Sequence, residues 1–502
     1  MAFFILLSCL SALVLAAILY AAVIQLISDA ENHLPPGPWP FPVIGNVLHM
    51  SKLPHRSLAR LAERYGPLMT VRLGTSLYIV ASSPSTAREI LQRHNASLSG
   101  RSPADAWRGG GHGDNSIFVL QPRRKWRMLR RLGAAHLFSP QRLQALQSLR
   151  QQVVCSRLLR DVLASVETGS LVSVRRVAFN AMVSLLWRAM FSNELDETAG
   201  QGLQDCVRAA MDLLMTPNVS DLFPFLADAD IQGVRRRVAI LIGKVYQLID
   251  QQINHRMKSS HGFSSEHRTN DDLLDVMLNM SEQHDHSGAT INRDVMRAFF
   301  TDLFVGASDT SSNTIEWALA ELLQNPTTMS ILQQELKTVL GSKTQVEDYD
   351  IDRLPYLQAV IKETLRLHSV VPMMSYRADA TVQVQGYTIP EGSNVLVNVW
   401  AIHHNADVWT EPHRFIPERF LHREVDFFGR SFHFLPFGSG RHMCLGLPLA
   451  NRMLNMMLGS LLHRFDWMLP EDVDRTDVDM KEKFGLVLSI ATPIQVIAKK
   501  KM

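Results

Sequence analysis

Hydrophobic residues recur at helical spacing through most of this chain, from about residue 84 to residue 370. Period-two alternation is confined to short stretches at 68–73, at 76–81 and between Ser375 and Val399. These stretches predict small β-sheets, the first of them a hairpin. Helices are expected at 56–64 and near 142–165, 201–215, 231–257 and 292–323. The fold class predicted is therefore mainly α with small β-sheets.

The first residues are apolar throughout, and no charged residue lies between Ala2 and Ile27. A helix of about 25 residues is roughly 37 Å long, which is enough to cross a bilayer. A cleaved signal peptide is the alternative, but no Lys or Arg precedes the run and it is longer than the apolar region of such peptides. We therefore expect residues 1–27 to form an N-terminal transmembrane helix that is retained as an anchor.

A proline-rich segment, Leu34-Pro35-Pro36-Gly37-Pro38-Trp39-Pro40, follows the apolar run. Closely spaced prolines exclude helix, so residues 28–45 are expected to form a stiff extended hinge. No long linker interrupts the chain after it, and 46–502 are expected to form one large domain. Polar stretches at 258–270 and 281–290 predict surface loops around a short helix.

Composition narrows the classes of protein. Of 502 residues, 46% are hydrophobic, and the net charge of +3 is too small to indicate binding to nucleic acid. The four cysteines, Cys9, Cys155, Cys206 and Cys444, are widely spaced. They form neither a disulfide framework nor a CxxC metal pair, and they suit a reducing compartment.

The sequence around Cys444 differs from that of the other cysteines. Gly438, Gly440 and Gly446 allow a tight backbone with positive φ, and a helical pattern begins at Leu447. A cysteine just before a helix N-terminus is favoured as a thiolate, and a thiolate bound to iron promotes O–O cleavage. A turn with a buried structural cysteine is the alternative.

This segment resembles the haem-binding signature of cytochromes P450, Phe-x-x-Gly-x-Arg-x-Cys-x-Gly, and the resemblance covers essentially the whole chain. Phe437, Gly440, Cys444 and Gly446 match, whereas His442 stands where the family has Arg. The resemblance implies a cytochrome P450 fold in 46–502 and haem b with Cys444 as its axial ligand. An imidazole at position 442 can still donate to a haem propionate.

Further segments follow in the order that the family shows. Glu363 and Arg366 are spaced to pair on one helix face; with Arg419 they are expected to form the family's buried Glu–Arg–Arg network, although a solvated pair is the alternative. Further expected haem contacts are Trp126, Arg130 and Arg377. Ser369 and Tyr376 replace prolines that are usual in plant members.

Basic residues surround Trp126: Arg123, Arg124, Lys125, Arg127 and Arg131. They are either a solvated helix face or a docking patch for an acidic flavoprotein, NADPH–cytochrome P450 reductase, which the resemblance implies as the electron donor.

Asp309 and Thr310 lie in an otherwise apolar helical stretch beside Gly306 and Ala307. Thr310 can bond back to a helix carbonyl, and an acid–alcohol pair can relay protons. The alternative is an N-cap-like pair in a surface helix. The stretch resembles the oxygen-activating motif of the family, with Ala307 in place of its second glycine.

The substrate pocket is expected, by resemblance, to be apolar and to suit a hydrophobic small molecule. Its expected wall residues are Phe118, Phe300, Val305, Val370, Val371, Met373, Leu486 and Leu488. The chain resembles plant microsomal P450s of the geraniol-hydroxylase-like group. This implies NADPH-dependent, O2-dependent hydroxylation of a terpenoid at the endoplasmic reticulum membrane, with the catalytic domain in the cytosol. Alternatives are a flavonoid or phenolic hydroxylase, a reductase-independent P450 that rearranges a peroxide, and a non-enzymatic haem or scaffold protein.

Overall fold

The computed structural model describes Phe4 and residues 33–260, 272–282, 290–422, 425–471 and 478–501. Apart from Phe4, the transmembrane helix expected at 1–27 lies outside these residues and stays a prediction. Within the described part of the chain, no helix combines the length and apolar character needed to cross a bilayer.

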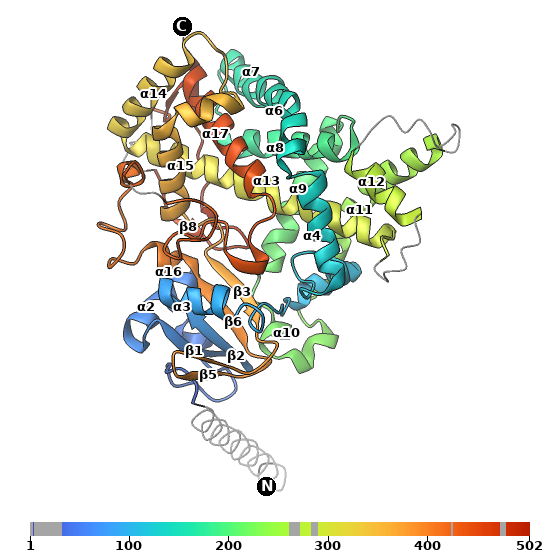
Figure 1. The fold of residues 1–502 in the computed structure, drawn as a ribbon, viewed down its shortest axis with the longest axis vertical. Helices are drawn as coiled ribbons and strands as arrows, with labels where there is room; N and C mark the ends of the chain where they lie inside the picture. The colour runs from blue at the N-terminus through green and yellow to red at the C-terminus, as the bar shows by residue number, and fades with distance from the viewer. Residues whose placement is uncertain are drawn as a thin grey trace.

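The described chain is mainly helical, with small sheets, as the hydrophobic pattern predicted (Figure 1). The α-helices are α2 (Pro54–Tyr65), α3 (Pro84–Arg88), α4 (Arg124–His136), α5 (Pro140–Ala145), α6 (Gln147–Val153), α7 (Arg160–Thr168), α8 (Val174–Phe191), α9 (Glu197–Leu214), α10 (Val219–Leu222), α11 (Val234–Ser260), α12 (Leu273–Glu282), α13 (Arg293–Gln324), α14 (Pro326–Leu340), α15 (Pro355–Leu367), α16 (Val399–His403) and α17 (Leu447–Arg464). Shorter helical segments are η1 (Val47–His49), η2 (Glu89–Arg93), η3 (Asp105–Asp114), η4 (Val154–Leu159), η5 (Pro224–Ala229), η6 (Asp348–Arg353), η7 (Pro417–Phe420) and η8 (Gly440–His442).

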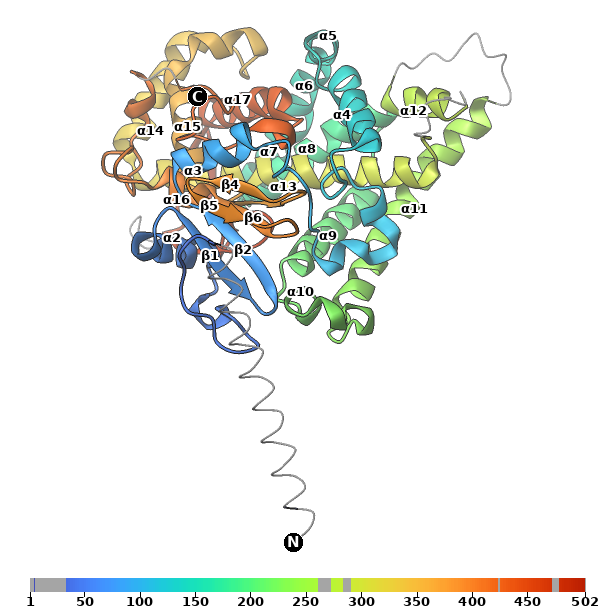
Figure 2. The same cartoon turned by 60° about the horizontal axis from the view of Figure 1, so that its bottom comes forward.

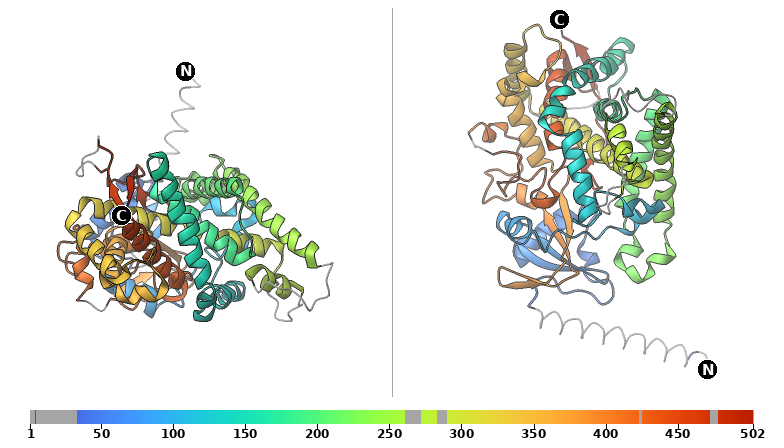
Figure 3. Two further views of the ribbon diagram at one scale, coloured as in Figure 1. Left: turned by 90° about the horizontal axis from the view of Figure 1, so that it is seen from above. Right: turned by 45° about the vertical axis from the view of Figure 1, so that its right-hand side comes forward.

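The strands are β1 (Leu68–Leu73), β2 (Ser76–Ala81), β3 (Met373–Arg377), β4 (Val382–Val384), β5 (Tyr387–Ile389), β6 (Asn394–Asn398), β7 (Phe465–Met468), β8 (Glu482–Lys483), β9 (Ser489–Ile490) and β10 (Ile497–Lys500). The largest sheet has the order β1-β2-β6-β3, with β2 and β6 parallel and the other pairs antiparallel. Figures 1 and 3 show it at the end of the molecule opposite the C-terminus.

The predicted hairpin is confirmed at both ends, since Leu68 pairs with Ala81 and Leu73 with Ser76. Gly74 makes its turn with a φ of 59°. The two faces of the sheet pack against different partners, one against α2 and the other against α3 and η2, which follows it. The sheet is therefore buried on both sides.

Helix α13 is the central element of the helical part, and Figure 2 shows it crossing that part from side to side. Its 32 residues give a length of about 48 Å. The Asn292 side chain caps its start by accepting from the backbone N–H of Val295 at 2.9 Å. Its residues are buried on nearly all faces, against α8, α15 and α17. Any group displayed along α13 is consequently held by a rigid, enclosed scaffold.

Several boundaries differ from the prediction. The stretch near 142–165 is divided into α5, α6, the π-helical η4 and α7. Helix α11 begins at Val234 because Asp230 and Gly233 have positive φ, which a helix cannot accommodate. Of the loops expected at 258–270 and 281–290, residues 258–260 and 281–282 are helical. Residues 261–270 and 283–289 lie outside the described ranges.

Residues 34–40 form no helix or strand and run along the sheet. The backbone N–H of Thr70 donates to the Pro36 carbonyl at 2.9 Å. The Asn46 side chain donates to the carbonyls of Pro38 and Trp39 at 3.1 and 3.0 Å. These bonds attach the proline-rich segment to the body; its role as a hinge between anchor and domain stays a prediction.

Candidate functional site

Cys444 lies in a glycine-containing loop between η8 and α17. Gly438 and Gly440 have φ values of 73° and 71°, which residues with a Cβ rarely adopt. A Cβ at Gly440 would also overlap the backbone carbonyl oxygen of Leu91. Gly446, in contrast, is the N-cap of α17 with a φ of −84°. The expected positive φ is thus found at Gly438 and Gly440, and Gly446 does not need it.

The Cys444 sulfur is surrounded by groups with opposing effects. Burial raises the pKa of its thiol, whereas the backbone N–H groups of Gly446 and Leu447 and the Arg130 guanidinium lower it. Both N–H groups belong to the start of α17, where the helix dipole favours negative charge. The side chain is nevertheless accessible. An exposed cysteine beside the N–H groups of a helix start is open to a ligand, whereas a purely structural cysteine is usually buried.

Five side chains from four segments form a continuous arc beside this loop. Trp126 and His442 have ring centroids 4.9 Å apart, and those of His442 and Tyr376 are 5.9 Å apart. The Arg130 guanidinium lies 5.1 Å from the Trp126 ring, and that of Arg101 lies 5.1 Å from the Tyr376 ring. Among the described residues, Trp126 Nε1 and Arg101 Nε are buried without a hydrogen-bond partner. Buried donors are nearly always paired, so the arc suits an anionic group.

His442 takes a different place in this arc from the one expected. Its Nε2 pairs with the Ser99 carbonyl oxygen at 2.8 Å. Burial, together with Arg101 and Arg130, lowers the pKa of the ring to about 3, so it is neutral. A neutral ring that donates from Nε2 can only accept at Nδ1. The expectation that His442 donates to a cofactor acid group is therefore not met, and Arg101, which the sequence analysis did not single out, supplies a cation instead.

Arg377 is not brought into the arc. Its side chain is exposed, whereas that of Tyr376 is buried. Adjacent residues of a strand point to opposite faces, so Arg377 and Tyr376 diverge. The backbone N–H of Arg377 donates to the Gly100 carbonyl at 2.9 Å and thereby fixes the segment that carries Arg101.

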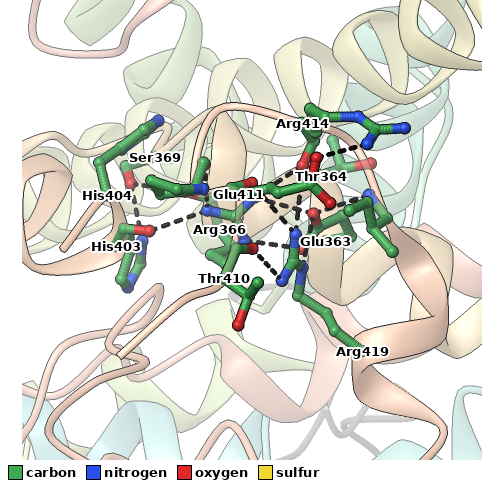
Figure 4. Close-up of polar contacts among 12 residues, drawn as sticks. Glu363, Thr364, Arg366, Ser369, His403, His404, Thr410, Glu411, Arg414 and Arg419 are labelled. Atoms are coloured by element: carbon green, nitrogen blue, oxygen red, sulfur yellow. Dashed lines mark hydrogen bonds and ion pairs between the residues drawn. The ribbon is translucent and has the colours of Figure 1, made fainter. Parts of the chain in front are cut away.

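Glu363 lies at the centre of a buried polar network (Figure 4). Its carboxylate accepts two bonds from Arg366, at 2.7 and 2.8 Å, one from Arg419 at 3.0 Å and one from the Ile416 N–H at 2.9 Å. Both Glu363 and Arg366 are fully buried. The structure thus brings the three predicted residues together, and the solvated alternative does not apply.

Ser369 extends this network toward the Cys444 loop. The backbone N–H of Leu435 donates to His403 Nε2 at 2.8 Å, so Nδ1 of this ring carries the proton and donates to Ser369 Oγ at 2.7 Å. Arg366 also donates to the His403 carbonyl at 2.8 Å. Through His403, Ser369 therefore supports the segment around Leu435 that precedes the thiol.

Asp309 and Thr310 lie in the middle of α13 and face different surroundings. Thr310 Oγ1 donates to the Gly306 carbonyl at 2.8 Å, as expected for an alcohol that bonds back to its helix. Asp309 lines a cavity of about 200 Å³ together with Arg175 and Arg208. Burial raises the pKa of Asp309, and the two arginines oppose that shift. The surface-helix alternative does not apply, because Asp309 is only partly exposed and lies in the middle of a helix that is buried on most faces.

Glu316 is an ionisable residue of α13 that the sequence analysis passed over. It is fully buried, with its carboxylate 3.5 Å from Arg175 Nε. Burial raises the pKa of Glu316 to about 7 despite this arginine. Its spacing of seven residues from Asp309 was the available signal, since such residues share a helix face.

Some expected pocket residues belong to the core. Phe300 is fully buried with its ring centroid 4.9 Å from that of Phe191. Leu488 is fully buried, and its carbonyl accepts from Trp317 Nε1 at 3.3 Å. Neither side chain reaches accessible space, so assigning them to the pocket wall was wrong.

The other expected wall residues have different surroundings. Val370 is almost fully buried, and Met373 packs on the α2 face of the sheet. Val371 is exposed, Val305 is partly buried, and Leu486 lines the Asp309 cavity. Phe118 lies against Gly306 of α13: its ring is 3.0 Å from where a Cβ of that glycine would be. Phe118 is therefore an expected wall residue from outside α13 that packs against the middle of this helix.

Comparison with known proteins identifies the class. The cytochrome P450 family model matches residues 35–498. The chain is 41% identical over 484 residues to geraniol 8-hydroxylase of Swertia mussotii, covering 96% of each chain. It is 39% identical over 500 residues to cytochrome P450 76T24 of Catharanthus roseus, covering 98% of this chain and 99% of that relative. It is 37% identical over 489 residues to ferruginol synthase of Salvia miltiorrhiza, covering 96% of this chain and 98% of that relative.

The chain belongs to the cytochrome P450 family. It is accordingly a monooxygenase, and the mainly helical fold with small sheets is that of the family. The family implies a haem held through a cysteine thiolate, and the residues present fit such a group. An accessible thiol with helix N–H groups suits the iron, and the unpaired donors of Trp126 and Arg101 suit the haem acid groups.

Proposed function

We propose that this protein is a membrane-anchored plant hydroxylase that holds haem b through Cys444 and oxidises a hydrophobic terpenoid. The observation that carries the proposal is the exposed Cys444 at the start of α17, beside an arc that contains unpaired buried donors. Haem ligated by a thiolate supplies the oxygen-activating chemistry. The protein contributes the ligand, the cradle and the proton path.

Each site residue has a proposed task. Cys444 supplies the thiolate, while Phe437 and Gly446 shape its loop; the Phe437 carbonyl accepts the Cys444 N–H at 2.9 Å. Trp126 and Arg130 bind the haem acid groups. Arg101 supplies a further cation to these groups, for which His442 and Arg377 were the expected additional contacts.

Glu363, Arg366 and Arg419 hold the segment behind the thiol. Asp309 takes protons from the charged cavity, and Thr310 passes them toward the cofactor side of α13.

Electrons are proposed to come from NADPH through NADPH–cytochrome P450 reductase. Arg123, Arg124, Arg127 and Arg131 of the basic cluster are exposed, whereas Lys125 donates to the Asp114 carbonyl at 3.1 Å. The docking patch therefore consists of the four arginines. Reversing the charge of Arg124 and Arg127 should slow electron delivery and flatten its salt dependence, with Lys125→Gln as a control. Unchanged kinetics would refute the patch.

The substrate proposal is supported by relatives whose names give terpenoid oxidations, geraniol 8-hydroxylase and ferruginol synthase. Residues 1–27 are proposed to anchor the protein in the endoplasmic reticulum membrane, with the catalytic domain in the cytosol. Membranes that contain the protein and reductase should be incubated with NADPH and a panel of terpenoids, flavonoids and a hydroperoxide. Hydroxylation of a terpenoid supports the proposal. Turnover of flavonoids alone, or of the hydroperoxide without reductase, would replace it.

A further inference from the structure

A buried polar contact joins the segment around η3 to helices α11 and α13, outside the groups already assigned. His112 Nε2 lies 3.0 Å from Asp302 Oδ1, and His112 Nδ1 lies 2.8 Å from the Tyr246 hydroxyl. The side chains of His112 and Asp302 are 2% and 1% exposed. Ser116 Oγ donates to Asp302 Oδ1 at 3.1 Å, and the Ile117 N–H donates to Oδ2 at 2.7 Å.

The chemistry of these groups fixes the direction of each bond. A carboxylate can only accept, so Asp302 accepts hydrogen bonds from His112 Nε2, Ser116 Oγ and the Ile117 N–H. Nδ1 of the ring pairs with the Tyr246 hydroxyl at 2.8 Å. Every polar atom of the ring is thereby paired, and the Trp107 ring stacks on it with centroids 5.8 Å apart. This arrangement of Tyr246, His112 and Asp302 is called the latch below.

Three consecutive glycines allow the latch to form. Gly110 and Gly111 have φ values of 61° and 72°, so the chain reverses directly before His112. A Cβ on Gly109 would lie 2.8 Å from the Arg235 carbonyl oxygen and 3.0 Å from the Ala239 nitrogen of α11. The glycines therefore let the segment lie close against α11 while His112 reaches across to α13.

The latch fixes the residue that follows it. Asp302 holds the backbone N–H of Ile117, which is adjacent to Phe118. The Phe118 ring lies 3.0 Å from a Cβ built on Gly306, one helical turn beyond Asp302. The carbonyl of Gly306 is also the group to which Thr310 donates. A short, largely buried chain of hydrogen bonds thus sets the place of an aromatic ring beside the middle of α13.

We propose that the Tyr246–His112–Asp302 latch is a specificity-determining device that holds Phe118 against Gly306 and so limits the width of the space beside this helix. The inference rests on the proposed function, because it takes that space as the distal side of a haem bound to Cys444. The three latch residues act through Phe118 and are positioning residues.

The test compares two ligands of ferric haem that differ in width, imidazole and phenylimidazole, by optical titration of the holoprotein. In Asp302→Asn the amide cannot accept all three donors, so Phe118 is released and the wider ligand gains affinity relative to the narrow one. We expect the ratio of the two dissociation constants to change by about threefold to tenfold, and in the same direction in Phe118→Ala. Tyr246→Phe, which removes a single hydroxyl, should give a smaller change and serves if Asp302→Asn does not fold.

A matched control lies on the same helix. Glu321 pairs with His368 Nε2 at 2.7 Å, and that ring stacks on Trp317. Like Asp302, Glu321 is a largely buried carboxylate of α13 that pairs with a histidine. It lies nineteen residues beyond Asp302, which is about 28 Å along the helix axis. Glu321→Gln should lower stability and leave the ligand ratio unchanged.

A double variant distinguishes a positioning role of the latch from general destabilisation of the protein. If the latch acts through Phe118, adding Asp302→Asn to Phe118→Ala produces no further change in the ratio. Additive changes, an equal change in Glu321→Gln, or an unchanged ratio in latch variants would overturn the inference. A wild-type protein that gives no thiolate-type spectrum with reduced haem and carbon monoxide would instead overturn the proposed function, so the two failures are distinguishable.

Discussion

Replacing Glu363 with Gln should destabilise the protein far more than the loss of one ion pair at the surface would. The Glu363 carboxylate accepts four hydrogen bonds while it and Arg366 are fully buried. The substitution keeps the shape of the side chain but removes its charge. The guanidinium of Arg366 then keeps its carbonyl partners on His403 and Pro412, both at 2.8 Å, without a counter-charge.

The size of this destabilisation follows from the burial of Glu363 and Arg366. Breaking a buried pair by removing one partner costs about 3–5 kcal/mol, because the remaining charge stays desolvated. A chain of this size has an unfolding entropy on the order of 1 kcal/mol per kelvin, so the midpoint of thermal unfolding should fall by about 3–5 °C. The matched control is Glu411→Gln, whose partner Arg414 has the same spacing along the chain but lies with it at the surface. There we expect a loss of less than about 1 kcal/mol.

The assay is thermal unfolding of the haem-loaded protein, followed by circular dichroism at a fixed scan rate. A large fall in the midpoint for Glu363→Gln and almost none for Glu411→Gln agree with this reasoning. Equal shifts in the two variants would mean that burial does not decide the cost, and the account of the network would be refuted.

Three further predictions concern the remaining polar groups. In Ser369→Ala the buried N–H of His403 loses its acceptor, so unfolding should become easier by about 1–3 kcal/mol, measured by the thermal midpoint. Glu316 has a folded pKa of about 7, above its ordinary 4.5, so the stability contributed by its protonated form is complete below pH 4.5 and is lost as the pH rises through 7. Glu316→Gln should abolish that loss, which is on the order of 3 kcal/mol, and an unchanged pH profile of the thermal midpoint would contradict the shift. Thr310→Ala should uncouple NADPH consumption from product formation, measured as product per NADPH with a terpenoid that the wild type turns over; full coupling counts against its role in proton transfer.

Local patterns were sufficient for much of the fold. The ends of the β1–β2 hairpin followed from period-two alternation and one glycine turn, because both signals lie within fourteen residues. The start of α11 was placed three residues too early, because the helical spacing of apolar residues does not report the positive φ of Asp230 and Gly233. The core position of Phe300 could not be distinguished from a pocket position, since apolar residues suit both.

The candidate site likewise has one part that was predictable from the sequence and another that was not. Cys444 and its glycines are contiguous, so the loop was predictable from the sequence together with the family signature. Arg101, Tyr376 and His442 meet only through the folded sheet, and none of their separations in the chain indicates contact. The bond between His112 and Asp302 likewise joins residues 190 positions apart. Such contacts depend on packing, which a single sequence does not reveal.

The most direct test of the whole account is the difference spectrum of the dithionite-reduced protein with carbon monoxide. We expect the long-wavelength Soret band of a thiolate-ligated haem in the wild type, retained in Cys155→Ala and Cys206→Ala and lost in Cys444→Ala. A band typical of a nitrogen ligand, or a thiolate band that survives Cys444→Ala, would contradict the assignment of Cys444 as the iron ligand.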